Sequence, residues 1–409
     1  MSDPLKAPIA AARASGALRQ MTARGRGESH RVSTPLELFF DLCFVVAVAQ
    51  AGARLVHAAG DGHPGHGVTG YLMVFFSIWW AWMNFSWFAS AYDTDDVPYR
   101  VTTLVQIVGS LILAAGVPRA FDDGDFRLSV IGYVVMRLAL VTQWLRAARS
   151  ETGGARATAL KYAVGVVVCQ VGWVILLLPL GAPPVWAFLV MALAELSVPT
   201  LAERSAPTAW HPHHIAERYG LFTIIVLGES VSAATVAVQS AVDAHRALGD
   251  LVPIAVGGLL IVFSAWWIYF AVPIHGHLAS NRQAFLWGYG HFAVFSSAAA
   301  IGAGLEIAVE QAVGASGVSM RGAAAAVTLP TAVFLLSVWA LHARHTKRGP
   351  AQQSTLPVTA AAVVACTFSG SHAVLWAGLV SAGAVALGVI LVARAAVHTP
   401  VAPSKEPTA

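Results

Sequence analysis

The side chains of this sequence that could do chemistry are acids and bases placed inside long apolar stretches. Ionisable groups inside a membrane cost about 2.5–3.5 kcal/mol each near its centre, so they usually form pairs or line a path for ions or protons. The deepest of them are Asp41, Arg137, Glu195 and Glu229. We expect Arg137 to pair with Asp41 or Glu195. Because there are three deep acids and only one deep arginine, the acids that do not pair with it must be protonated, hydrated or bound to a cation.

The spacing of these residues places several of them on shared helix faces. Glu37 and Asp41 are four residues apart, which puts both on one face. Arg218 and Glu229 are eleven residues apart, again on one face and about 16 Å apart along the axis. Glu37, Glu217 and Arg218 lie nearer the ends of their stretches, where a structural polar role is expected. Ion pairs that only hold helices together remain the alternative for the whole set.

Two tryptophan pairs could wall a cavity in the membrane. Trp79 and Trp80 lie in one apolar stretch, and Trp266 and Trp267 lie in another. The alternative is that they anchor or pack their helices, since tryptophan is common at membrane interfaces. Both interpretations stay open at this point.

Histidines occur both inside an apolar stretch and at the start of one. His291 lies inside its stretch and is the better candidate for a proton carrier, because its charge can change near neutral pH. His211, His213 and His214 precede an apolar stretch, where a solvated position is expected rather than a metal site.

The motifs of several enzyme classes are absent from the sequence. No phosphate-binding G-x-x-x-x-G-K-S/T, no G-x-G-x-x-G after a strand, no H-E-x-x-H and no G-x-S-x-G occurs. The cysteines lie singly in apolar stretches, as free buried thiols do: Cys43, Cys169 and Cys366. We therefore expect no enzyme activity, no cofactor, no metal and no ATP-driven pumping by this chain alone.

The composition indicates that the helices that carry these residues have a surface that faces lipid. Of the 409 residues, 57% are hydrophobic and 11% charged, whereas soluble domains carry about 25% charged residues. About 20 apolar residues span a bilayer as a helix. We predict an all-α fold of about 12 transmembrane helices near 34–55, 69–90, 99–117, 126–147, 160–180, 184–202, 213–239, 251–273, 283–308, 321–343, 355–370 and 373–396. The boundary between the last two rests on the short polar break at 369–372.

The distribution of basic residues predicts the orientation. With a cytoplasmic N-terminus, 18 of the 25 Lys and Arg residues lie on the cytoplasmic side and 5 in the outer loops. This bias places both termini in the cytoplasm of a cell-membrane protein. It also explains the basic net charge without nucleic acid. Residues 1–30 are expected to form a disordered basic tail, and 399–409 a second disordered tail.

Two strings recur in the halves of the chain. FSIWWAW at 76–82 resembles FSAWWIY at 263–269, and each follows a stretch with a glutamate near its start, Glu37 or Glu217. We therefore predict two six-helix repeats, 31–205 and 206–398. Because six is even, the repeats would be parallel, related by an axis along the membrane normal.

Four motifs carry a family resemblance. They are PLELFFDLCFVVAVAQ at 35–50, YDTDD at 92–96, ERYGLFTIIVLGES at 217–230 and YGH at 289–291. With these the chain resembles the bacterial low temperature requirement protein A (LtrA) family, over about residues 30–310. The resemblance implies a multi-pass membrane protein linked by name to growth in the cold and to no settled reaction.

These observations favour a secondary transporter or channel for a cation, a proton or a small solute. Its path would use Asp41, Glu229, Glu195, Arg137 and His291. The alternative is a non-transporting stress-response scaffold or sensor whose buried charges are only structural. The oligomeric state is left open by the sequence.

Overall fold

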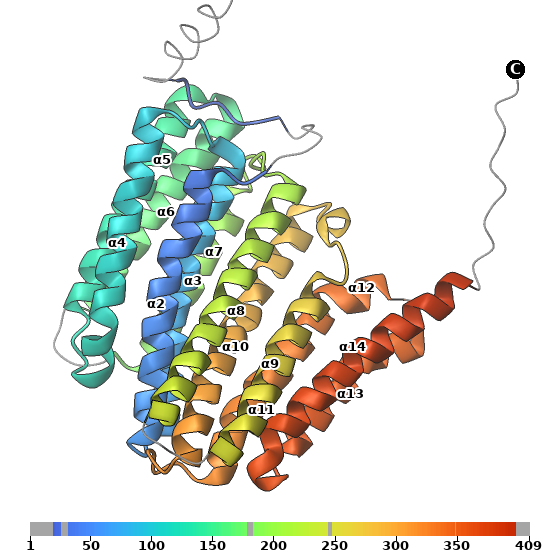
Figure 1. The fold of residues 1–409 in the computed structure, drawn as a ribbon. Coiled ribbons are helices and arrows are strands. Elements are labelled where there is room, and N and C mark those ends of the chain that lie inside the picture. The colour runs from blue at the N-terminus through green and yellow to red at the C-terminus, as the bar shows by residue number, and fades with distance from the viewer. Residues whose placement is uncertain (1–18, 26–31, 178–182, 244–247, 348, 398–409) are drawn as a thin grey trace, which may run out of the picture. The chain divides into compact units, whose positions relative to one another are not determined.

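The computed structural model describes residues 19–25, 32–177, 183–243, 248–347 and 349–397. These residues form helices joined by short turns (Figure 1). The long helices are α2 (Pro35–Gly60), α3 (Pro64–Tyr92), α4 (Val97–Asp122), α5 (Arg127–Ser150), α6 (Gly153–Leu177), α7 (Val185–Ala202), α8 (Pro212–Asp243), α9 (Leu248–Phe270), α10 (Asn281–Ala312), α11 (Met320–Val338), α13 (Pro350–Cys366) and α14 (Ala373–Val397). Each corresponds to one predicted stretch.

The helix lengths confirm a multi-pass membrane fold. Eleven helical spans in the described residues are long and apolar enough to cross a membrane. One of them, Met320–Thr346, joins α11 through the π-helical turn η2 (Trp339–Ala343) to α12 (Arg344–Thr346). The twelfth helix, α13, has 17 residues and sits at the lower limit of a spanning length. The predicted break before α14 is the short turn η3 (Gly370–His372).

Apolar side chains lie on outer faces of the helices, whereas Arg137 and Arg218 are buried. On α6, Val164, Val168 and Ile175 are more than 60% exposed. In contrast, the guanidinium-bearing side chains of Arg137 and Arg218 are 1% and 0% exposed. This arrangement is expected for a protein in a lipid bilayer, because charged side chains within a membrane usually face the protein interior.

Contacts divide the chain into two compact units, which are described separately. Unit 1 contains residues 1–229 and 274–292, and unit 2 contains 230–273 and 293–409. In unit 1, α2 packs on α3 and α4, and α4, α5, α6 and α7 pack in sequence; in unit 2, α9 packs on α14 and α13 on α11 and α14. This division differs from the expected boundary at 205/206. The parallel two-repeat relationship stays a prediction.

Glycines allow close helix contacts in each unit. A methyl group on Gly132 of α5 would lie 2.5 Å from the carbonyl oxygen of Gly109 on α4, and one on Gly378 of α14 would lie 2.5 Å from that of Gly257 on α9. Small residues at such crossings let membrane helices pack by backbone contact. These glycines allow the backbones of α4 and α5, and of α9 and α14, to lie in direct contact.

A short N-terminal segment is ordered against unit 1. Met21 is fully buried, and the backbone N–H of Arg24 donates to the carbonyl of Ala91 at 3.0 Å. The backbone N–H of Arg19 donates to the carboxylate of Asp96 at 2.9 Å. The expected tail over 1–30 therefore has an ordered part at 19–25. Its other residues, and 399–409, lie outside the described residues.

Candidate functional site

The start of α2 fixes the first acid of the site. Pro35 is suited to the first helical position, and Thr34 caps the helix. The N–H of Thr34 donates to Oε2 of Glu37 at 2.7 Å, while the N–H of Glu37 donates to the Thr34 hydroxyl at 3.3 Å. This reciprocal capping box holds the Glu37 side chain in the first turn and leaves Oε1 for other contacts.

Two basic residues of α8 meet the acids of α2. Nε2 of His214 lies 3.1 Å from Glu37 Oε1, and Nη1 of Arg218 lies 3.2 Å from the same oxygen. These two are close ionic contacts rather than well-aligned hydrogen bonds. Arg218 also donates from Nη2 to Asp41 Oδ1 at 2.5 Å and from Nε to Oδ2 at 3.1 Å. We call Glu37, Asp41, His214 and Arg218 the α2–α8 cluster.

Aromatic side chains close the α2–α8 cluster off from solvent. Trp82 of α3 donates from Nε1 to Asp41 Oδ1 at 2.7 Å, and the Phe85 ring centre lies 5.7 Å from the Arg218 guanidinium carbon. Tyr99 of α4 lies near enough to interact electrostatically with Arg218. All four cluster side chains are fully buried. Two carboxylates therefore share one permanent cation in a low-dielectric site.

This cluster corrects two expectations drawn from the sequence. His214 was expected to be solvated, but it is fully buried against Glu37. The sequence predicts that Asp41 is one of three deep acids that share a single arginine, Arg137. In the structure a second arginine, Arg218, binds Asp41 with two nitrogens. The position of Arg218 near the start of α8 does not expose it, because α2, α3 and α4 cover that turn.

A second buried pair joins α5 to α7. Nη2 of Arg137 lies 2.8 Å from Glu195 Oε1 and also donates to the Tyr133 hydroxyl at 2.8 Å. Glu195 further accepts from Nε1 of Trp80 at 2.8 Å and of Trp173 at 3.2 Å. The predicted pairing of Arg137 is thus confirmed with Glu195 rather than with Asp41. Here one acid and one base balance each other.

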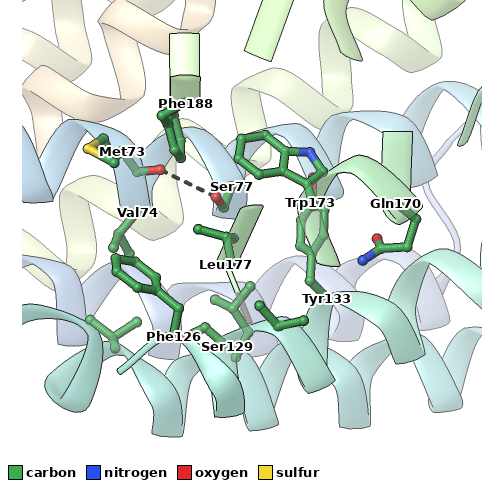
Figure 2. Close-up of a pocket in the computed structure, with 13 residues that line it drawn as sticks. Met73, Val74, Ser77, Phe126, Ser129, Tyr133, Gln170, Trp173, Leu177 and Phe188 are labelled. Carbon is green, nitrogen blue, oxygen red and sulfur yellow. Dashed lines mark hydrogen bonds between the residues drawn. The ribbon is translucent and has the colours of Figure 1, made fainter. Parts of the chain in front are cut away.

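A cavity opens beside this second pair. It measures about 40 Å³ and is bordered by α3, α4, α5, α6 and α7 of unit 1. Figure 2 shows Gln170, Tyr133 and Trp173 toward one end of it, with Met73 and Val74 toward the other. Tyr133 and Trp173 both reach from the cavity wall to the Arg137–Glu195 pair.

Glu229 and His291 lie on α8 and α10. Glu229 of α8 is half-buried and makes no hydrogen bond or ion pair with the residues that the structure describes. His291 of α10 is fully buried, its Nδ1 lies 2.7 Å from the carbonyl oxygen of Trp287, and its ring lies 4.8 Å from that of Tyr219. Because a carbonyl only accepts, Nδ1 carries the hydrogen.

Within the described residues no three His, Cys, Asp or Glu side chains gather as a metal site needs.

The two halves of the expected repeat differ at matching positions. Glu217 is half-buried, and its carboxylate accepts from the backbone N–H of Ser33 at 3.3 Å, whereas Glu37 is fully buried. Trp79 and Trp80 are 2% and 0% exposed, but Trp266 and Trp267 are 47% and 49% exposed. Trp266 and Trp267 lie on an outer face of α9, which favours the second of the two interpretations left open, that they anchor or pack their helix.

Several residues of the site were not singled out from the sequence. His214 carried a usable signal, since it lies four residues before Arg218 just as Glu37 lies four before Asp41. One acidic and one basic face of matching spacing predict a contact. Trp82, Trp173, Tyr133 and Gln170 gave no such signal, because their polar atoms are recognisable only when their partners are known.

Comparison with known proteins shows which family this chain belongs to. A protein of Rhizobium meliloti (strain 1021), described as Uncharacterized protein RA0937, is 27% identical over 203 residues. That alignment covers 48% of this chain and 48% of the relative, so the chain spans about half the length of the relative it matches. The family model for the bacterial low temperature requirement A protein (LtrA) matches residues 32–393. The chain therefore belongs to the bacterial low temperature requirement A family of integral membrane proteins.

Proposed function

We propose that this protein is a secondary transporter or channel for a cation, a proton or a small solute, and that the α2–α8 cluster is its proton site. The observation that carries the proposal is the charge count of the cluster. Glu37 and Asp41 contribute two negative charges, and Arg218 contributes one positive charge. With His214 neutral, the buried cluster has a net charge of −1.

A net charge buried in a low-dielectric site is costly, and one bound proton removes it. The proton can reside on His214, Glu37 or Asp41, since all three are in contact with the shared charge. Trp82 and Phe85 of α3 cannot bind this proton. Tyr99 of α4 is a further titratable side chain near Arg218. A cluster that needs one proton for neutrality is suited to binding and releasing it.

The same helix offers a second place for a proton. Glu229 lies eleven residues beyond Arg218 on α8, about 16 Å along the axis and on the same face. Glu229 is half-buried and makes no hydrogen bond or ion pair with the residues that the structure describes. Two proton-binding positions along one spanning helix support movement across the membrane rather than a purely structural role.

The test is proton movement in liposomes that contain the purified protein and a pH-sensitive dye. Gradients of Na⁺, K⁺ and a panel of small uncharged solutes are imposed in turn at both polarities of membrane potential. We expect at least one gradient, or the potential itself, to change the internal pH faster than in protein-free liposomes. Folded protein that moves protons under none of these conditions would overturn the proposal.

A matched pair of variants ties the signal to the cluster. Asp41→Asn removes one negative charge, so that Glu37 and Arg218 balance without a proton, and proton movement should be lost. Asp61→Asn makes the same change at an exposed loop position and should leave it intact. Equal proton movement in folded Asp41→Asn and Asp61→Asn would exclude the cluster as the proton site.

A further inference from the structure

The cavity beside the Arg137–Glu195 pair contains a buried side chain with unused hydrogen-bonding capacity. Gln170 of α6 is 7% exposed, and neither its Oε1 nor its Nε2 has a hydrogen-bond partner among the residues that the structure describes. A buried carboxamide without partners costs free energy comparable to lost hydrogen bonds. Gln170 lines the cavity (Figure 2), so a molecule in that cavity is in position to supply both partners.

The hydrogen-bonding groups around Gln170 define what such a molecule must offer. Gln170 presents one acceptor, Oε1, next to one donor, Nε2. Tyr133 accepts a hydrogen from Arg137 Nη2, which leaves its own hydroxyl hydrogen to donate. The complement is a planar group with a carbonyl oxygen as acceptor and an adjacent N–H as donor. A primary amide or urea has this pattern.

The charge of the neighbouring ion pair and the size of the cavity further restrict the class of ligand. Arg137 and Glu195 neutralise each other, so this pair leaves no net charge for an ionic ligand to compensate. The rest of the wall is largely apolar, from Met73, Val74 and Leu113. An ordered water needs roughly 10–15 Å³ of such space, and the cavity of about 40 Å³ therefore holds about three waters or a molecule of three or four heavy atoms.

We propose that this cavity is a binding site for a small uncharged amide, held by Gln170 with Tyr133 and packed against Trp173. This inference rests on the proposed transport function in one respect: if the protein transports a solute, small uncharged amides are the class of solute that this site would bind. Binding itself requires no transport. Because Tyr133 and Trp173 also bind Arg137 and Glu195, an occupied cavity contacts both residues that orient the second ion pair.

The probe is radiolabelled acetamide, whose equilibrium binding to purified protein in lipid nanodiscs is measured without any ion gradient. We expect saturable binding that unlabelled acetamide and urea displace and that acetate at neutral pH does not. Acetate that displaces as well as acetamide would overturn the uncharged-amide assignment. Folded protein without saturable acetamide binding would overturn the site.

Matched glutamine variants locate the binding. Gln170→Leu keeps the approximate volume and removes both polar atoms, so acetamide affinity should fall at least tenfold. Gln106→Leu is the control. Gln106 of α4 is also buried, and its Nε2 has no hydrogen-bond partner in the described part of the chain, but it does not line the cavity. An unchanged affinity in folded Gln170→Leu would refute the assignment. Acetamide binding without proton movement would leave this site standing and reject only the transport proposal, and the reverse result would reject only this site.

Discussion

Replacing Arg137 with leucine tests how much the second buried pair contributes to folding. Arg137 is 1% exposed and contacts Glu195 at 2.8 Å, so the substitution leaves a buried carboxylate without its cation. Removing one partner of a buried pair typically costs about 3–5 kcal/mol. Glu195 keeps its hydrogen bonds from Trp80 and Trp173, which stabilise the carboxylate. We therefore expect a loss at the lower end, about 3 kcal/mol.

A double variant separates the pair from simple loss of packing. In Arg137→Leu/Glu195→Gln the unpaired charge is gone, and the new carboxamide oxygen can still accept from a tryptophan Nε1. The double variant should recover at least about 1 kcal/mol relative to the sum of the two single losses. The free energy of unfolding is measured by reversible denaturant titration in mixed micelles. Additive losses would refute the reasoning.

The control is an arginine on the same helix. Arg127 begins α5, is about half-exposed and pairs with Asp125 at 3.4 Å. Exposed pairs of this kind contribute about 0–1 kcal/mol. Arg127→Leu should therefore change the unfolding free energy by less than about 1 kcal/mol. A loss as large as that of Arg137→Leu would show that burial of the charge does not explain the effect.

Three further predictions concern the loop before α4, the acid of α8 and the chain ends. Burial of Asp96 raises its pKa, but the hydrogen bonds from Arg146, Arg19 and Tyr99 outweigh it and hold the pKa below its usual value. A lowered pKa contributes stability that is complete above the unfolded value of about 3.9 and is lost as the pH falls through the folded value. Asp96→Asn should remove this acid-dependent part, which melting curves between pH 7 and pH 3 would reveal; identical curves would contradict it. Glu229→Gln should abolish the proton movement of well-folded protein in liposomes, whereas normal movement would reject its role. Reporter fusions at both termini should be active only in the cytoplasm, and activity outside the cell would reverse the topology.

The helices could be predicted because their signal is local. A run of about 20 apolar residues bounded by polar breaks is sufficient to recognise a spanning helix, and the break at 369–372 correctly separated α13 from α14. The partner of Arg137 was also within reach, since only a few acids lie deep enough. The choice of Glu195 over Asp41 required the packing of α5 against its neighbours.

The α2–α8 cluster was only partly predictable because it depends on contacts across 177 residues of chain, from Asp41 to Arg218. The sequence placed Glu37 and Asp41 on one face, and the matching four-residue spacing of His214 and Arg218 was the signal that could have identified the helix that meets them. His214 stood at a helix start, where solvent is the ordinary environment, and α2 covers it instead. The tryptophan pair of FSIWWAW is buried, whereas that of FSAWWIY is about half-exposed, so the surrounding helices rather than the string decide the burial of these side chains.

Glu37→Gln provides the most direct test of the proton site. Glutamine is accepted at this position of a capping box, so the start of α2 should stay folded. The substitution leaves Asp41 and Arg218 balanced, and the cluster no longer needs a proton. Glu217→Gln, at the half-buried glutamate of α8, is the matched control. We predict that proton movement in liposomes is lost in Glu37→Gln and kept in Glu217→Gln, with both proteins folded. Wild-type proton movement in folded Glu37→Gln would contradict it.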